Sequence, residues 1–287
     1  MKAWITNPWG KPRFLVLFTW LFIVWSIVPI IIAIAFSFND GRSRTAWQGF
    51  SLRWFYHDPL GSVWQDDALR SAMWHSLELA CFAMLIATPL GVALAIGLQR
   101  WQSKAGTAAN GLMLVPLVTP ELVMGASMFI LFTQLFGFIG LGTPAQVIGQ
   151  VTFSISYVVV IVRGRLVSIG PEYEEAAADL GAPPWDVLRR VLLPLLAPAI
   201  VSGLLIVFAL SIDDFVVTSY LAKGADTETV PIKLYSTARG APTPALNALA
   251  SIMVAITLLS VALAYFVYKR FARGTGGSAL ESIGGSR

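Results

Sequence analysis

Six long runs of apolar residues constrain the fold of this chain more than any other feature of its sequence. Of its 287 residues, 56% are hydrophobic and 13% are charged, which is too apolar for an ordinary soluble domain. A bilayer core is roughly 30 Å thick and a helix rises about 1.5 Å per residue, so about 20 apolar residues span it. The sequence therefore predicts an all-α, polytopic membrane protein. Its six transmembrane helices run approximately over Phe14–Phe36, Ser76–Leu98, Gly111–Phe132, Val147–Val167, Leu195–Leu221 and Ala248–Tyr268.

Basic residues predict the orientation of these spans. With the N-terminus inside, 13 of the 20 Lys and Arg residues fall in cytoplasmic segments, and the outer loop at residues 133–146 has no charge. Because Lys and Arg are enriched on the cytoplasmic side, we expect both termini to be cytoplasmic. The net charge of +4 then reflects topology, and nucleic-acid binding explains it poorly.

We expect one membrane domain with an appended segment at each end. Residues 1–70 would hold the first span, retained rather than cleaved, and a long outer loop. Residues 71–270 would form the core of the domain, and residues 271–287, rich in Gly and Ser, a flexible cytoplasmic tail. Aromatic residues of the outer loop, such as Trp47, suit the membrane interface, and anchoring at lipid headgroups is favoured over contact with a partner.

The cytoplasmic loop at residues 169–194 predicts two short helices. Pro171 suits a first helical turn, the acidic residues after it favour a helix N-terminus, and Gly181 can end the helix. Pro184 then begins a second helix, and Pro194 marks its junction with the fifth span. One face of the first helix is small and rich in alanine, a shape that another protein can grip; it is formed by Tyr173, Ala176, Ala177 and Leu180.

The same loop resembles a known family motif. The stretch "EAAADLG" at residues 175–181, followed nine residues later by "VLLP" at 191–194, is similar to the EAA loop of ATP-binding-cassette (ABC) importer permeases, E-A-A-x-x-x-G-x(9)-I-x-L-P. Only Val191 departs from it. The resemblance implies a type I ABC importer permease fold in a bacterial inner (plasma) membrane, with this loop docked in a cleft of a separate ATPase subunit. The implied coupling residues are Glu175, Ala176, Ala177, Gly181 and Pro194.

Energy for transport is expected to come from another polypeptide. The chain contains no G-x-x-x-x-G-K-[ST] phosphate loop, so we expect ATP to be bound by the partner and no cofactor to be held here. His57 and His75 are too few and too poorly placed for a metal centre. No nucleophile and base stand out as a pair, so the chain is expected to be a transport subunit and not an enzyme.

Four acidic residues fall within predicted spans or at their edges: Glu78, Glu121, Asp213 and Asp214. An ionised carboxylate at a helix centre costs on the order of 2.5 to 3.5 kcal/mol, and no Lys or Arg is predicted at comparable depth. Protonation, a water-filled cavity or a mobile cation would each lower this cost. Asp213 and Asp214 would lie about 100° apart on a helix, so we expect one to face a pathway and the other to cap, hydrogen-bond or reach a partner.

Glu121 and Glu78 carry different local signals. Pro116 and Pro120 precede Glu121, and each removes a backbone donor, which frees carbonyl groups beside the carboxylate. Such a lining favours a cation, although a proline kink that only fits a helix contact is an alternative. Glu78 lies near an aqueous face, where simple hydration explains it equally well.

A second resemblance narrows the family. The stretch "SIDDFVVTSY" at residues 211–220 is similar to S-L-D-D-F-V-I-T-x-F of spermidine/putrescine permeases, and "PELVMG", "TVP" and "NALA" at residues 120–125, 229–231 and 247–250 match as well. Gln150 and Ser156 stand where such permeases often carry histidine and proline. The resemblance implies polyamine import with an ATP-binding subunit dimer, a second homologous permease and an extracytoplasmic polyamine-binding protein. Aromatic faces such as Trp47 and Tyr157 would assist the acids through cation–π attraction.

Two other functions remain open at this point. One alternative is a permease of the same kind of importer for another cationic or small organic solute. Alternatively, the chain would be a secondary transporter or channel that uses its intramembrane acids as a relay. That interpretation leaves the EAA loop unexplained, and no inverted repeat is visible.

Overall fold

The computed structural model describes residues 13–43, 46–58, 61–100, 103–239 and 243–272. The Gly- and Ser-rich segment from Gly274 onwards, predicted to be flexible, lies outside these residues, as do Lys2 and Lys11. The chain divides into two compact units. The first contains the chain up to Asp66 together with residues 242–251, and the second contains residues 67–241 and the chain from Ile252. Within the described residues the secondary structure is helical, apart from one isolated bridge between Asn39 and Phe50.

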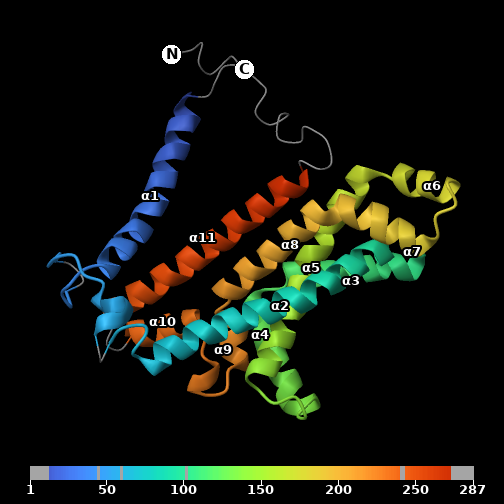
Figure 1. The fold of residues 1–287 in the computed structure, drawn as a ribbon. Helices are drawn as coiled ribbons and strands as arrows, with labels where there is room; N and C mark the ends of the chain where they lie inside the picture. Colours follow the sequence, from blue (N-terminus) through green and yellow to red (C-terminus); the bar gives the residue numbers. More distant parts are fainter. Residues whose placement is uncertain (1–12, 44–45, 59–60, 101–102, 240–242, 273–287) are drawn as a thin grey trace. The chain divides into compact units, whose positions relative to one another are not determined.

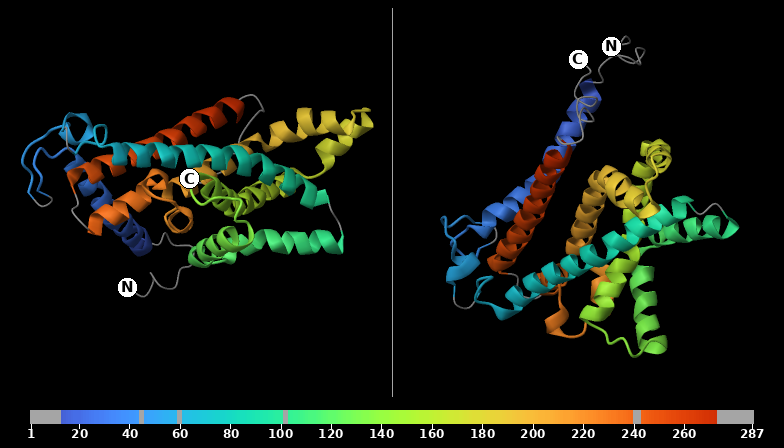
Figure 2. Two further views of the ribbon diagram at one scale, coloured as in Figure 1. Left: turned by 90° about the horizontal axis from the view of Figure 1, so that it is seen from below. Right: turned by 45° about the vertical axis from the view of Figure 1, so that its right-hand side comes forward.

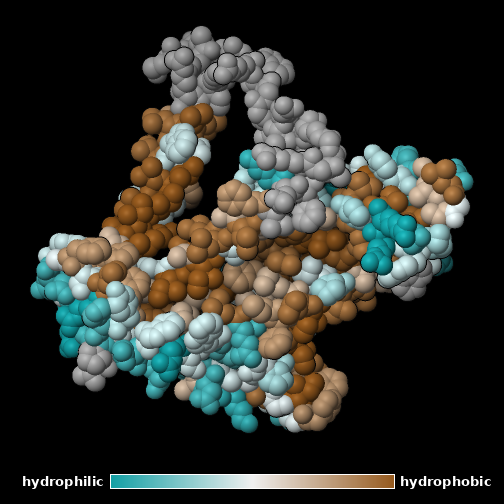
Figure 3. All heavy atoms as spheres, viewed as in Figure 1, coloured by the Kyte–Doolittle hydropathy of each residue, from teal (hydrophilic) through white to brown (hydrophobic). Residues whose placement is uncertain are grey.

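The first unit begins with helix α1 (Arg13–Ser37), which is apolar along its whole length. Figure 3 shows its surface covered by hydrophobic residues, and none of its spanning window is buried within this chain. A lipid or protein environment must therefore cover it, because exposed apolar surface of this size is not stable in water.

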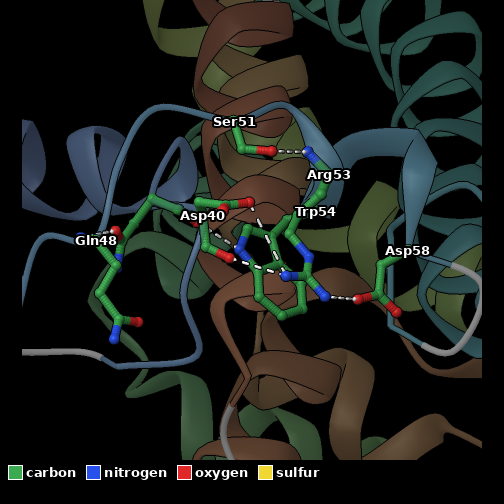
Figure 4. Close-up of polar contacts among 7 residues, drawn as sticks. Asp40, Gln48, Ser51, Arg53, Trp54 and Asp58 are labelled. Carbon is green, nitrogen blue, oxygen red and sulfur yellow. Dashed lines mark hydrogen bonds and ion pairs between the residues drawn. The ribbon is translucent and has the colours of Figure 1, made fainter.

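A polar anchor holds the outer segment that follows α1. The indole Nε1 of Trp54 donates to the Asn39 carbonyl at 2.7 Å, and Trp54 is buried. Figure 4 shows the neighbouring Arg53 at the start of the short helix η2 (Arg53–His57), with its guanidinium directed at Asp58 and Asp40. The contact to Asp58 is 2.6 Å and the one to the Asp40 carbonyl is 3.1 Å.

The second unit is built around three long helices, α2, α5 and α8, which pack against one another. Their apolar faces share a core that includes Ala87, Val158 and Leu196. Figures 1 and 2 place α6 and α7 at one end of these helices and α9 and α10 at the other. The elements of this unit are α2 (Asp67–Arg100), α3 (Lys104–Val118), α4 (Glu121–Ile130), η3 (Leu131–Leu135), α5 (Thr143–Ile169), α6 (Glu172–Asp179), α7 (Pro184–Asp186), η4 (Val187–Leu192), α8 (Leu193–Asp213), α9 (Val216–Leu221), η5 (Ala225–Thr227) and α10 (Val230–Arg239); α11 (Pro244–Ala272) begins in the first unit and ends in the second.

The predicted spans are recovered, with two differences. Five helices of the described residues are long and apolar enough to cross a membrane, and a sixth candidate is the pair Lys104–Val118 and Glu121–Leu135, which is bent by 106°. The prediction of a single third span over Gly111–Phe132 misses this bend. The bend follows Thr119, because Pro120 cannot donate a helical hydrogen bond and its ring disfavours a helical conformation for the residue before it.

The fifth span also differs from its prediction. We expected one helix over Leu195–Leu221, but α8 ends at Asp213 and α9 begins at Val216. Asp214 has an extended backbone (ψ 112°), so the two aspartates do not share a helix as predicted. The interruption is stabilised by hydrogen bonds that the Asp214 carboxylate accepts from the backbone N–H groups of Val217 and Thr218, because short Asp side chains compete with the helical backbone for such groups.

Helices α2 and α5 approach each other closely at Gly91. A Cβ atom added to Gly91 would lie 2.6 Å from Cβ of Val158. We expect Gly91→Ala to destabilise the protein by about 1–2 kcal/mol, because overpacking costs about 1–3 kcal/mol and alanine regains up to about 1 kcal/mol of helix propensity. Thermal unfolding in detergent measures this. Gly97→Ala on the same helix is the matched control, since nothing lies within 4 Å of its added Cβ; equal midpoints for both variants would contradict the close contact.

Candidate functional site

The predicted coupling loop is a helix-turn-helix at one end of the second unit (Figure 1). Helix α6 ends in a turn where the N–H of Ala182 donates to the Ala177 carbonyl at 3.0 Å and that of Gly181 to the Ala178 carbonyl at 2.8 Å. This is the Schellman arrangement, which needs a left-handed residue after the helix. Gly181 supplies it with φ +83°, as predicted for a helix-ending glycine.

Pro194 lies where the π-helical segment of the loop continues into the span α8. The six residues before Leu193 form the π-helical segment η4, and the chain then continues as α8 without a break. A proline ring clashes with the carbonyl four residues earlier, here Arg190, and it cannot donate to that carbonyl. A π turn is wider than an α turn, so it accommodates the proline while the helix axis continues into the membrane span.

Several large apolar side chains of the coupling loop are exposed. Leu180 is 90% exposed, Trp185 66% and Tyr173 57%. Glu175 and Ala176 are exposed, and Ala177 is half-buried. Large exposed apolar residues beside small ones form a patch of the kind that binds another protein.

An ion pair joins the coupling loop to α2. Glu174 in the first turn of α6 pairs with Arg100 in the last turn of α2. A carboxylate is stabilised near a helix N-terminus and a guanidinium near a C-terminus, so both helix dipoles favour this pair. The pair lines a cavity of about 590 Å³, which also contacts the C-terminal part of α5 at Leu166 and Val167.

The two aspartates of the interrupted span have different environments. Asp214 is only 8% exposed, and its carboxylate accepts from the N–H groups of Val217 at 3.1 Å and Thr218 at 3.2 Å. It is therefore the cap of α9, which is the pattern expected of Asp at a helix start. Asp213, the last residue of α8, is exposed. One aspartate thus caps a helix and the other is free to meet solvent or a solute.

Two glutamines that the sequence analysis did not assign to the site complete it. Gln150 of α5 contacts Asp214 and Ser211, and Gln146, one turn earlier, contacts the ends of α9 and η5. Both side chains are fully buried. The sequence signal that could have identified them is two amide side chains spaced four residues apart in an apolar span. A buried amide needs hydrogen-bond partners for all its polar atoms, so such a pair indicates polar contacts with neighbouring helices.

Glu121 lies at the bend between α3 and α4. It is the first residue of α4, directly after Pro120, and it is exposed. Its position at a helix N-terminus is electrostatically favourable. Helix α4 packs against α9, where a Cβ at Gly125 would meet the Tyr220 ring at 2.8 Å.

The remaining predicted pathway residues lie further from this cluster. Glu78 is about half exposed, and its Oε2 lies 3.8 Å from Nδ1 of His75. The other ring nitrogen of His75 contacts Gln146, so Glu78 reaches this glutamine indirectly, through the histidine. Tyr157 is half-buried and contacts Phe153 edge to face, about 10 Å of helix rise along α5 from Gln150.

Trp47 belongs to the first unit, where its exposed ring lies edge-on to Phe36 at 6.3 Å between centroids. Its predicted contact with a solute therefore stays a prediction. Among the described residues no group of three or more His, Cys, Asp or Glu side chains is arranged to hold a metal ion.

Comparisons with known proteins give a consistent result. Residues 87–277 match the family described as binding-protein-dependent transport system inner membrane component. The chain is 35% identical over 260 residues to the spermidine/putrescine transport system permease protein PotC of Haemophilus influenzae, covering 90% of this chain and 98% of that protein. It is 34% identical over 271 residues to the putrescine transport system permease protein PotI of Escherichia coli K12, covering 93% and 92%.

A solved structure shows the same fold. It is that of a bacterial ABC transporter involved in the import of the acidic polysaccharide alginate, with a TM-score of 0.70 at 19% identity. The match covers 90% of this chain and 96% of that one. The helical arrangement is therefore that of ABC importer permeases.

Proposed function

This chain belongs to the family of binding-protein-dependent transport system inner membrane components, and on that premise we propose that it is the permease subunit of an ATP-driven polyamine importer. The observation that carries the proposal is similarity over nearly the whole chain to two permeases, PotC and PotI, whose names specify spermidine and putrescine or putrescine alone. Its helices are apolar and of spanning length, in keeping with a multi-pass membrane protein.

The acidic cluster supports the choice of a polyamine. Asp213 and Glu121 are both exposed. Asp213 precedes the buried Asp214 in the sequence, and Glu121 is the first residue of α4, which packs against the α9 helix that Asp214 caps. A polyamine is an elongated chain with two to four ammonium groups, so separate carboxylates can each bind one of them. Moderate attraction at each site suits transport, because a pathway that holds its solute tightly does not release it.

The exposed coupling loop supports the proposed partners. An ATPase subunit would bind the surface of α6 around Ala176 and Leu180, and the Schellman turn at Gly181 would set the angle at which that surface is presented. This arrangement requires α6 and both chain termini to be cytoplasmic. A second homologous permease, a dimer of ATPase subunits that bind ATP, and an extracytoplasmic polyamine-binding protein complete the proposed complex, and no cofactor is assigned to this chain.

ATP-dependent uptake into vesicles that contain the full complex tests the proposal. We expect labelled putrescine and spermidine to accumulate only with ATP and the binding protein, and unlabelled putrescine to compete. Butylamine, which has the same carbon chain with one ammonium group, should compete at least about tenfold more weakly, because it lacks one charge-assisted contact.

The competition pattern also separates the alternatives. Uptake of another cationic or small organic solute, with putrescine inert, would contradict the polyamine assignment and leave the importer assignment intact. Uptake driven by an ion gradient in the absence of the ATPase would contradict both, and would favour a secondary transporter.

A further inference from the structure

We infer that Gln146 and Gln150 are positioning residues that hold the end of α8 and helix α9 against α5 and thereby keep Asp213 exposed and Asp214 buried. The two glutamines lie one turn apart on α5, and both are 0% exposed. Each reaches a different end of the interrupted span. The inference about transport rests on the proposed function, whereas the inference about structure does not.

Gln150 holds the end of α8. Its Oε1 accepts from the Ser211 hydroxyl at 2.5 Å, and its Nε2 lies 3.4 Å from the Ser211 carbonyl and 3.5 Å from Oδ2 of Asp214. Carbonyls in the last turn of a helix lack an intrahelical partner, and leaving one unpaired in a membrane span costs several kcal/mol. One amide therefore satisfies the freed carbonyl and fixes the buried carboxylate.

Gln146 holds the end of α9. Its Nε2 donates to the Thr218 carbonyl at 3.1 Å and to the Thr227 carbonyl at 2.9 Å, and its Oε1 lies 2.9 Å from Nε2 of His75. These bonds join α5 to the last turn of α9, to η5 and to α2. The side-chain contacts of both glutamines thus run to neighbouring elements and not to α5 itself.

Helix α9 depends on these bonds because it is short. It has six residues, far fewer than an isolated helix needs to persist. Close contacts add to the bonds, since a Cβ at Gly149, between the two glutamines, would lie 2.8 Å from Leu221 and 3.0 Å from Val217. Without the amides, α9 would lose its anchor to α5, and Asp214 would no longer be confined to its buried position.

Cysteine reactivity in the full complex tests the structural part. In a Cys81→Ser background, Val217→Cys places a thiol at a position of α9 that is 1% exposed. We expect a positively charged methanethiosulfonate reagent to modify it slowly, and about tenfold or more faster after Gln146→Leu or Gln150→Leu, because each change removes hydrogen bonds worth at least that factor in an opening equilibrium.

Thr152→Val is the matched control, because this exposed α5 hydroxyl bonds only to the Ile148 carbonyl of its own helix. It should leave the rate unchanged, and Asp213→Cys should react rapidly in every background. Unchanged modification of the position-217 thiol in both leucine variants would overturn the inference. This readout involves neither ATP nor a solute, so it stands or falls independently of polyamine import.

Uptake kinetics test the transport part. Gln150→Leu should raise the KM for putrescine about tenfold, while Gln150→His, whose imidazole N–H can still donate to Asp214, should restore most of it. A merely structural role would lower the amount of assembled complex equally for both variants without changing KM. Equal KM values for leucine and histidine, or a loss in maximal rate alone, would refute the positioning role.

Discussion

Replacing Gly181 by valine should reduce ATP-driven uptake to the level of vesicles without ATP. The residue has φ +83°, and a left-handed conformation costs a residue with a side chain roughly 1–2 kcal/mol, more when the side chain is β-branched. The turn would relax, the bonds from Gly181 and Ala182 to α6 would be lost, and the ATPase would meet a misdirected surface. Co-purification of the ATPase subunit with the permease, measured beside uptake, reports the loss directly.

Gly224→Val is the matched control for this prediction. Gly224 also has a positive φ, of +77°, and as at Gly181 nothing lies within 4 Å of an added Cβ. The backbone strain is therefore similar, but the residue lies between α9 and η5, at the end of the unit away from α6 (Figure 1). It should keep the ATPase bound. If Gly181→Val retains the ATPase and normal uptake, the coupling assignment is wrong.

Replacing Asp213 or Asp214 by asparagine should affect solute binding to very different extents. Asp213→Asn removes an exposed charge, so we expect the KM for putrescine to rise by roughly 10- to 100-fold, the equivalent of one charge-assisted hydrogen bond. Asp214→Asn keeps one of the two side-chain oxygens, which can still accept from the N–H of Val217, because Asn caps helices as well as Asp does. Its KM should change by less than about threefold.

Asp214→Ala provides the structural control for this pair. It removes the cap of α9, which is worth about 1–2 kcal/mol, and leaves two buried N–H groups unpaired. The yield of folded complex should therefore fall in this variant and not in either asparagine variant, as size-exclusion chromatography in detergent would measure. Equal rises in KM for Asp213→Asn and Asp214→Asn would show that both carboxylates bind the solute and that the cap is not the main role of Asp214.

Much of the fold followed from apolar runs and helix signals. The length of a run predicts a span regardless of its neighbours, and local signals such as Pro171, Gly181 and Pro184 depend only on the backbone of a few residues. The first helix of the loop, its turn at Gly181 and the start of the second helix at Pro184 were therefore predicted closely, whereas the continuation of the second helix into α8 was not. That one of the two aspartates would cap a helix or form hydrogen bonds was also anticipated, although not which one, and the pathway role of the other stays a prediction.

Features that depend on distant partners were not predictable in the same way. The break at Asp214 needs an amide from α5, and the contact at Gly91 needs Val158 from another helix, so neither is encoded by local periodicity. Hydropathy also averages over about 20 residues, so it could not separate a straight third span from two helices bent at Pro120. The Gln146 and Gln150 pair was visible in the sequence, but only the interrupted helix beside it explains why two amides are buried there.

The length of α2 has a mechanical consequence. At about 1.5 Å per residue, the stretch of α2 from His75, which contacts Gln146, to Arg100 of the ion pair extends roughly 38 Å. A tilt of a straight helix of that length by ten degrees about one end displaces the other end by about 7 Å. Pro89, inside the helix, lacks the N–H that would stiffen its turn, and is a position at which α2 can bend. A movement of Arg100 at the coupling loop would in this way be transmitted along α2 to His75 and its contact with Gln146.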